Sequence, residues 1–304
     1  MKLPRFLTTP LPPSVILLGE NEITLALLSR RRDALVRVET VDLEAECFRQ
    51  GPVGLLHVDR AMLTSAIGKL VQRVGKLPAR GTVVVPTAWV RCVQVETGGL
   101  PRQRGEAEDV IRWRLKKLLP CRPEEVRLDF VPLGDEDRVL VVLALDHPLL
   151  VVEEVLAGAG LRVGRIEPTA VAVTSLVPAD GVPRLVVVSE RRSLGFVVVE
   201  DGTITLLRQK GLPGDLDRAA GFVAREVDQS ISQVQPLSDG ARPVEVWVVA
   251  IDETGASGVE DALEGREGVA VRRLVAEGER VPGGCSLAAA SLCVLLASGA
   301  GREA

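Results

Sequence analysis

The apolar and polar residues of this chain follow the same order of elements twice, in residues 15–97 and again in residues 184–264. Each copy has three short β-rich runs separated by tight polar turns, then a stretch with helical apolar spacing, then another apolar run. The runs are 15–18, 23–28, 34–43, 61–74 and 82–86 in the first copy, and 184–188, 194–199, 203–208, 216–234 and 244–250 in the second. Each copy therefore predicts a mixed sheet with an antiparallel hairpin edge, one helix and one further buried strand.

Two units of this kind, facing each other, build the nucleotide-binding proteins of the actin and sugar-kinase type, and the order of elements in this chain resembles that architecture. We therefore expect an α/β fold with duplicated actin-like, ribonuclease H-like lobes and a small α+β insert subdomain. The resemblance indicates a scaffold and leaves the function open, because one fold carries many functions.

The insert is predicted between the two copies, in residues 80–145. Residues 90–96 alternate like a strand, residues 106–119 have helical spacing, and residues 126–131 and 139–145 predict two more strands. The helix is acidic in its first turn and basic in the remainder, which is the polarity that the helix dipole favours. Pro120 is expected to end it.

These patterns divide the chain into four parts. They are a proline-rich N-terminal tail (1–13), the first lobe (14–79 with 146–180), the insert (80–145) and the second lobe (181–304), whose residues from about 209 to 243 make a reduced cap. The prolines of the tail keep it extended, so we expect either a binding arm or a disordered segment.

The composition is that of a protein with an aliphatic core and no strong field. Hydrophobic residues make up 46% of the chain, aromatic residues only 3%, and tyrosine is absent. A net charge of −4 gives no overall attraction for nucleic acid or anionic membranes. Five cysteines without a CxxC pair are expected to be reduced thiols and not a metal or redox site.

The sequence has no segment of the kind that directs export or spans a membrane. The N-terminus lacks an apolar run of signal-peptide length. Residues 285–298 predict an apolar helix, but this stretch is shorter than the roughly 20 residues that a bilayer crossing needs, which favours a buried helix. We therefore expect a cytoplasmic protein.

Several short motifs in and around the insert resemble one family. They are Val83-Val-Val-Pro-Thr87, Leu100-Pro101, Val110-Ile-Arg-Trp113, Leu119-Pro120 and Glu124-Glu-Val-Arg-Leu-Asp-Phe130. This set is similar to the insert subdomain of PilM, the cytoplasmic actin-like protein of type IV pilus assembly, which is related to the cytoplasmic part of the type II secretion protein GspL. The order of the strand, helix and strand that follow, through Ala170, also resembles that family.

The resemblance implies a place in the cell and a set of partners. A PilN-like membrane protein is expected to dock a short N-terminal cytoplasmic peptide beside the insert. The chain would then be peripheral at the inner membrane through its partners, among other inner-membrane platform proteins and with no nucleic acid. Self-association is left open.

The resemblance also implies ATP binding in the cleft between the lobes, through three elements. The first is an Asp-x-Gly hairpin, for which this chain has Leu17-Leu18-Gly19-Glu20-Asn21. The second reads Ser189-Glu190-Arg191-Arg192, and the third, a glycine-rich turn, reads Ala250-Ile-Asp-Glu-Thr-Gly255. The candidate nucleotide-binding residues, if a nucleotide binds, are Gly19, Glu20, Asn21, Ser189, Arg191 and Arg192.

All three elements depart from the pattern that a magnesium-bound triphosphate requires. Such a ligand needs carboxylate oxygens for the metal and backbone N–H groups at close approach for the phosphates. Leu17 stands in place of the first acid, and glycine is missing from the second hairpin. We therefore expect a pseudo-ATPase with no catalytic residue, no metal site and no cofactor. The alternatives are an active ATP-binding PilM-type protein and an unrelated α/β enzyme with a small-molecule pocket.

A basic cluster on the predicted insert helix is the candidate partner-binding surface. It comprises Arg112, Trp113, Arg114, Lys116 and Lys117. Such a cluster is commonly a solvated helix face, and the alternative is a docking surface for an acidic partner segment or lipid headgroups. The only two histidines, His57 and His147, lack a recognisable serine or cysteine partner, so triad chemistry is not expected.

Overall fold

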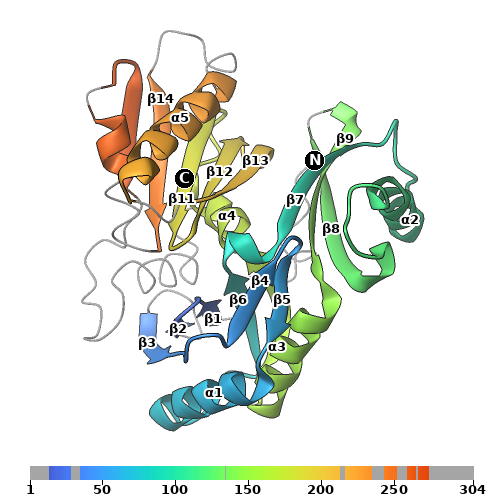
Figure 1. Cartoon of the computed structure of the whole chain (residues 1–304), viewed down its shortest axis with the longest axis vertical. Helices are drawn as coiled ribbons and strands as arrows, with labels where there is room; N and C mark the ends of the chain where they lie inside the picture. The colour runs from blue at the N-terminus through green and yellow to red at the C-terminus, as the bar shows by residue number, and fades with distance from the viewer. Residues whose placement is uncertain are drawn as a thin grey trace.

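The computed structural model describes residues 14–28, 35–133, 135–212, 216–234, 243–251, 259–264 and 266–273. They form two lobes, each built on its own sheet, and an insert that projects to one side (Figure 1). The prolines of the tail and the predicted helix 285–298 lie outside the described residues.

The first lobe is built on a five-stranded mixed sheet with the order β10-β6-β1-β2-β3. Its strands are β1 (Ser14–Leu18), β2 (Glu22–Leu28), β3 (Leu35–Asp42), β6 (Arg80–Val85) and β10 (Arg162–Pro168). The first three are antiparallel neighbours, whereas β6 pairs in parallel with both β1 and β10. The three hairpin-connected strands therefore form one edge of the sheet, as the sequence predicts.

Helices α1 (Arg60–Val74) and α3 (Asp146–Gly158) and the hairpin of β4 (Phe48–Gly51) and β5 (Gly54–Val58) cover this sheet. Asp59 starts α1 by accepting a hydrogen bond of 2.9 Å from the Met62 amide. The sequence did not predict the β4–β5 hairpin, because β4 (Phe-Arg-Gln-Gly) lacks an apolar alternation. Gly54 is needed there: its φ is +107°, and a Cβ would lie 2.2 Å from the Trp89 carbonyl oxygen.

The second lobe repeats this topology with the order β13-β12-β11-β14-β15. Its elements are β11 (Arg184–Glu190), β12 (Ser193–Glu200), β13 (Thr203–Gly211), α5 (Leu216–Val234), β14 (Val244–Ala250) and β15 (Val269–Arg273). The pairings match those of the first lobe one for one, with β11 in the place of β1 and β14 in the place of β6. The predicted duplication of the lobes is therefore confirmed.

Helix α5 has the bounds that its apolar spacing predicts, and Val223, Val227, Ile231 and Val234 bury its apolar face against the second sheet. Between β13 and β14 it is the only helix in the described residues. In the first lobe the corresponding chain between β3 and β6 holds α1 and the β4–β5 hairpin. Hairpin β4–β5 therefore has no counterpart among the described residues of the second lobe.

The insert is a three-stranded antiparallel sheet in the order β7-β9-β8, covered on one face by α2. Its elements are β7 (Arg91–Glu96), α2 (Arg104–Leu115), β8 (Val126–Leu133) and β9 (Asp135–Leu145). Two predicted bounds are corrected. The range 80–145 included β6, which belongs to the first sheet. The helix predicted as 106–119 ends at Leu115. In the turn that follows, the amides of Leu118 and Leu119 donate hydrogen bonds to the Leu115 carbonyl.

A continuous apolar core joins the two lobes. Helix α4 (Thr169–Ala172) and the 3₁₀ turn η4 (Val173–Leu176) lie between the two sheets and pack against both. Leu17 and Val84 of the first sheet and Val188 and Val249 of the second are 4% exposed or less in this core. An apolar interface of this kind opposes the free relative motion that separately folded domains show.

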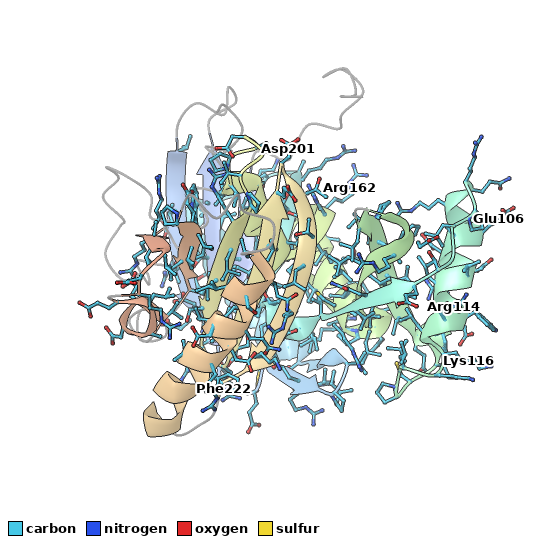
Figure 2. All side chains as sticks on the ribbon, turned by 90° about the horizontal axis from the view of Figure 1, so that it is seen from above. Glu106, Arg114, Lys116, Arg162, Asp201 and Phe222 are labelled. Atoms are coloured by element: carbon cyan, nitrogen blue, oxygen red, sulfur yellow. The ribbon has the colours of Figure 1, made fainter. Side chains whose placement is uncertain are left out.

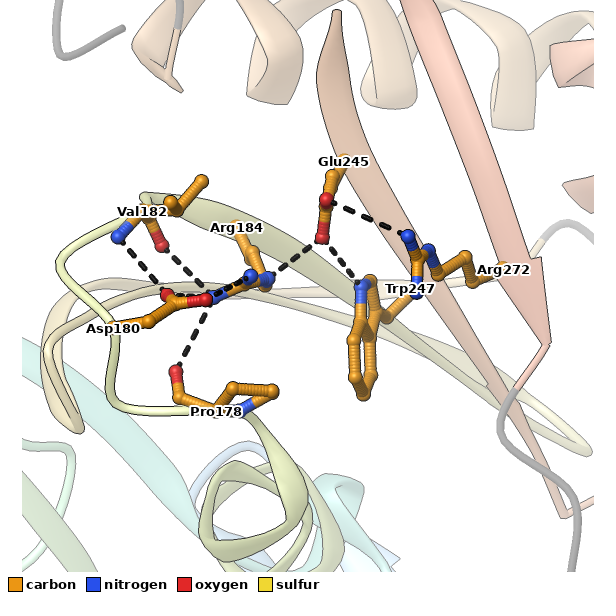
Figure 3. Close-up of polar contacts among 7 residues, drawn as sticks. All are labelled: Pro178, Asp180, Val182, Arg184, Glu245, Trp247 and Arg272. Atoms are coloured by element: carbon orange, nitrogen blue, oxygen red, sulfur yellow. Dashed lines mark hydrogen bonds and ion pairs between the residues drawn. The ribbon is translucent and has the colours of Figure 1, made fainter. Parts of the chain in front are cut away.

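Arg184 fixes the chain where it enters the second lobe (Figure 3). Its guanidinium binds both carboxylate oxygens of Asp180, at 2.6 and 2.8 Å, and that of Glu245 at 2.7 Å, and it lies over the Trp247 ring. Hydrogen bonding to Asp180 raises the pKa of Arg184, and the same bonds lower the pKa of Asp180. The segment that links the lobes is thereby held against the first strand of the second sheet.

Candidate functional site

A cleft of about 440 Å³ lies between the lobes and is lined by residues from both of them. The β1–β2 hairpin contributes Gly19, Glu20 and Asn21, and the β11–β12 hairpin contributes Arg191. The structure thus brings together four of the six residues predicted for a nucleotide. The pairing of duplicated hairpins across one cleft follows from the duplicated topology of the lobes.

The remaining two predicted residues are placed differently. Arg192 is exposed and makes an ion pair with Glu20, at 3.4 Å between Nε and Oε2. Ser189 does not line the cleft. Side chains alternate along β11, so Ser189 shares a face with Val187, which packs toward α5, while Val188 and Glu190 point to the other face.

The first hairpin uses its own hydrogen-bonding groups within the fold. The Gly19 amide donates to the Glu22 carbonyl at 2.8 Å, so it is already occupied in the turn. A Cβ at Gly19 would lie 3.0 Å from the same oxygen, which gives the glycine a local structural role. Glu20 accepts a hydrogen bond from Gln50 Nε2 at 3.1 Å in addition to its contact with Arg192.

Glu190 makes a buried polar contact between the lobes. Its carboxylate oxygens accept from the Thr87 amide at 2.8 and 3.0 Å, from the Thr87 hydroxyl at 3.2 Å and from the Ser193 hydroxyl at 2.9 Å. Thr87 begins η2 (Thr87–Trp89), which follows β6 in the first lobe. Glu190 is 5% exposed, and this burial raises the pKa of its carboxyl group despite the hydrogen bonds.

Sequence reasoning missed this contact because it searched the second hairpin for an acid and a glycine in register. An acid at the end of an apolar strand was visible at Glu190, but its partner Thr87 is 103 residues away. The nearest signal in the sequence was the acid Glu190 after the apolar run Leu185–Val188, followed three residues later by the hydroxyl group of Ser193.

The charges that line the cleft are mainly acidic. Glu20, Glu22, Asp42 and Glu190 line it together with a single basic residue, Arg191. Leu17 occupies the position at which the resemblance implies a metal-holding acid. It is 4% exposed and lies in the core between the lobes. No metal-binding group of histidine, cysteine and acidic side chains occurs among the described residues.

The third predicted element is described only in part. Ile251 lines the cleft, and its amide donates to the Ser189 carbonyl at 2.8 Å, which continues the sheet beyond β14. Residues 252–255 of this turn lie outside the described residues.

The other reactive side chains do not assemble a catalytic site within the described part of the chain. His57 and His147 are both exposed, on β5 and at the start of α3. Cys47, Cys92 and Cys121 are free thiols, and burial raises the pKa of Cys47 to about 11 and of Cys92 to about 12. A thiol with a raised pKa is a poor nucleophile at neutral pH.

A second cavity, a groove of about 280 Å³, lies between the insert and the first lobe. Its apolar lining includes Val142 and Ala144 of the insert sheet, Leu149 of α3, and Val163 and Ile166 of β10. Charged side chains also line it, and they are Arg104, Arg127, Asp129, Glu153 and Arg165. The groove therefore combines apolar surface with charges of both signs.

The walls of the groove include two edge strands. β10 is the last strand of the first sheet, and β8 is an outer strand of the insert sheet, so each has one side without a strand partner among the described residues. β10 has an irregular register between Val163 and Arg165, and Gly164 between them is exposed. Arg127 of β8 bonds Asp146 at 2.8 Å and Glu153 at 2.7 Å, which fixes β8 against α3.

The predicted partner-binding cluster on α2 divides into two parts. Arg112 points back to the insert, where its guanidinium donates to the Pro123 carbonyl at 2.5 Å and to the Val126 carbonyl at 2.9 Å. Trp113, Arg114, Lys116 and Lys117 are exposed, and the Arg114 guanidinium lies 5.2 Å from the centre of the Trp113 ring. Arg112 therefore has a structural role that its neighbours lack.

No family model and no curated protein matches the sequence. Among solved structures, the chain is similar to a chain of the PilM–PilN type IV pilus biogenesis complex, with a TM-score of 0.65 at 18% identity over 97% of this chain and 100% of that one. It is also similar to a Bacteroides thetaiotaomicron protein with an actin-like ATPase fold and unknown function, with a TM-score of 0.53 at 8% identity over 85% of this chain and 90% of that one.

These similarities show that the chain has the actin-like ATPase fold, and they confirm the resemblance to PilM at the level of fold. No described helix combines the length and the apolar character that a membrane crossing requires.

Proposed function

We propose that this chain is an actin-like scaffold of the inner-membrane platform of a type IV pilus or type II secretion system. It holds the N-terminal cytoplasmic peptide of a PilN-like membrane protein in the groove between the insert and the first lobe, and it stands at the cytoplasmic face of the membrane through that partner. The observation that carries the proposal is the groove itself, in a fold similar to a chain of the PilM–PilN complex.

The groove suits an extended peptide with apolar side chains. The edge of β10 offers backbone N–H and C=O groups to an added strand, which is a common way of binding extended peptides. The apolar surface of Val142, Ala144 and Ile166 can receive alternate side chains of such a strand. Arg165 pairs with Glu167, and Asp129 pairs with Arg104 at 2.6 Å, so charges on the peptide would fix its direction by exchanging with these ion pairs.

The cleft between the lobes supports a scaffold without ATP hydrolysis. A triphosphate placed there would face Glu20, Glu22 and Asp42, and like charges at close range are destabilising. The Gly19 amide is occupied by the Glu22 carbonyl, and the Thr87 amide at the start of η2 is occupied by Glu190. Two backbone donors beside the cleft are thus already used inside the protein.

Peptide binding by groove variants tests the proposal. The probe is a synthetic peptide with the N-terminal cytoplasmic sequence of a PilN-like protein from the same organism, measured by calorimetry with the whole protein. Val163→Asp puts a charge into the apolar lining of the groove and is expected to weaken binding at least about tenfold, or about 1.4 kcal/mol.

The matched control is Val36→Asp on β3, the opposite edge of the same sheet, where Val36 is 65% exposed. It makes the same chemical change on an edge strand that does not line the groove, and it is expected to leave the affinity unchanged. Equal binding by both variants and the unchanged protein would remove the groove from the proposal. Failure of the unchanged protein to bind the peptide would overturn the proposed function itself.

A further inference from the structure

The C-terminal end of α2 is the most exposed apolar and basic part of the insert. Helix α2 stands at the outer side of the insert, away from both lobes (Figures 1 and 2). Trp113 is 69% exposed and Leu118, in the turn after the helix, is 53% exposed. Two large apolar side chains thus face solvent within a stretch of six residues, and Trp113 is the most exposed of the large apolar side chains in the described residues.

This end of α2 also carries unbalanced positive charge, although the whole chain has a net charge of −4. No acidic residue occurs from Val110 to Pro123. The five basic residues of that stretch are Arg112, Arg114, Lys116, Lys117 and Arg122. Arg112 is bound to backbone carbonyls and Arg122 to Glu125, so three basic side chains project from the surface.

Those three cations are available to a partner. Arg114, Lys116 and Lys117 are exposed, and none makes an ion pair with a described residue. Figure 2 shows Arg114 and Lys116 pointing outward from α2 at the outer edge of the molecule. Basic residues at a helix C-terminus favour the helix dipole, but that effect does not account for the exposure of Trp113 and Leu118 beside them.

We propose that this surface, which we call the α2 foot (Trp113, Arg114, Lys116, Lys117 and Leu118), docks directly on anionic lipid headgroups. Tryptophan favours the interfacial region of a bilayer, and leucine can enter the acyl boundary beside it. Lysine and arginine are attracted to the negative potential of the cytoplasmic leaflet. The foot is a protruding end of the molecule, a shape that meets a flat lipid surface more readily than it encloses a peptide.

Three cations and one tryptophan make a weak contact on their own. Its contribution grows when another contact already holds the protein at the membrane, because docking then becomes an intramolecular step with a high effective concentration. The foot goes beyond the proposed function, since it requires no protein partner and uses no residue of the groove.

Vesicle co-sedimentation of the whole protein without any partner tests the foot. The vesicles are phosphatidylcholine alone, or phosphatidylcholine with about 30 mol% phosphatidylglycerol. The bound fraction is expected to rise at least about threefold with the anionic lipid at about 50 mM salt, and to fall to the phosphatidylcholine level at about 500 mM, because salt screens exposed charges.

Two pairs of variants distinguish the foot from general charge attraction. Lys116→Glu with Lys117→Glu is expected to abolish the gain, whereas Lys69→Glu with Lys76→Glu, the same change of charge on and just after α1, should retain it. Trp113→Ser is expected to lower binding about threefold or more, whereas Val36→Ser should not. All four lysines of the charge variants are exposed, so we expect the substitutions to leave the thermal unfolding transition unchanged. Measuring that transition verifies that the variants are folded.

Three results would overturn the proposal. One is the absence of any gain with phosphatidylglycerol, and another is an equal loss in the Lys69/Lys76 control. The third is binding of an acidic peptide, such as polyglutamate, through the foot without binding of vesicles, which would assign the surface to a protein partner instead. None of these results depends on the groove, so failure here is separate from failure of the proposed function.

Discussion

The two cavities of this protein differ in what their own residues already do. In the cleft between the lobes, Glu190 binds Thr87 and Glu20 pairs with Arg192, so the hairpin that each lobe brings to the cleft is joined to the opposite lobe. In the groove beside the insert, an apolar lining lies next to two strand edges that lack a strand partner among the described residues. Internal contacts thus occupy polar groups on both sides of the first cavity, which still has a volume of about 440 Å³, whereas the strand edges beside the second have no strand partner among the described residues.

This difference indicates which of its two cavities a duplicated two-lobe fold can use as a binding site. A cleft that opens and closes around a ligand needs donors that are free for the ligand and an interface that can move. Here the sheets meet through an apolar core around α4 and are held together by Glu190. Binding in the groove requires no movement of the lobes, because edge strand β10 and the insert sheet already form its walls.

Removal of the Glu190 carboxylate is expected to give the largest change in the contact between the lobes, measured as a loss of stability. Glu190→Ala leaves the Thr87 amide and two hydroxyl groups without their buried acceptor. We expect a loss of about 2–4 kcal/mol in the free energy of unfolding, measured by urea titration. Glu190→Gln keeps one acceptor oxygen and should lose distinctly less.

The matched variant for this test is Glu20→Gln, which weakens a second polar contact between the lobes. Its ion pair with Arg192 is at 3.4 Å and Arg192 is 74% exposed, so we expect a change below about 1 kcal/mol. A loss at Glu20 as large as that at Glu190 would show that the mouth of the cleft, and not its buried floor, holds the lobes together.

The next largest expected effect is a dependence of the folding stability on pH that arises from Glu190. Burial raises the pKa of Glu190 above its ordinary value of 4.5, so the folded protein binds this proton more tightly than the unfolded chain. The resulting stabilisation is fully present below the unfolded pKa and is lost as the pH rises through the folded pKa. Glu190→Gln should therefore remove a decrease in stability that the unchanged protein shows from about pH 4.5 upward.

Urea titrations of both proteins at several pH values measure this difference. Other groups contribute to both curves equally, so the difference between the curves isolates Glu190. Parallel curves over the whole range would mean that the Glu190 carboxylate titrates alike in the folded and unfolded states, which contradicts the role of burial.

The elements of the lobes were predictable because their signals are local. The strands of both sheets are apolar runs between polar turns, and α5 has seven apolar residues at helical spacing. Their topology follows from the same pattern occurring twice. The β4–β5 hairpin escaped prediction because β4 is mostly polar. The end of α2 was predicted too late because Leu118 is in helical register, although it is exposed in the turn after the helix.

The contacts that define the two cavities were less predictable because they join distant parts of the chain. Glu190 and Thr87 are separated by 103 residues, and the groove combines β10 with the insert sheet. Arg112 was grouped with its exposed neighbours, yet carbonyl groups of Pro123 and Val126 hold it. Local patterns specify charge and periodicity, but they do not reveal which side chains acquire a partner across the fold.

The smallest expected effect is the response to ATP, and it tests both cavities in one assay. A ligand at about 100 times its dissociation constant stabilises the folded state by about 2.7 kcal/mol, which raises the melting temperature by several degrees for a chain of this size. The groove peptide at that ratio should produce such a shift. ATP with magnesium at millimolar concentration should produce none, with no release of phosphate, because acidic side chains dominate the lining and the Gly19 and Thr87 amides are already bound to Glu22 and Glu190. The peptide serves as the positive control for the assay, so an absent shift with ATP is informative. A magnesium-dependent shift with ATP would mean that the cleft is open to a nucleotide after all, and the contrast between the two cavities would then have to be abandoned.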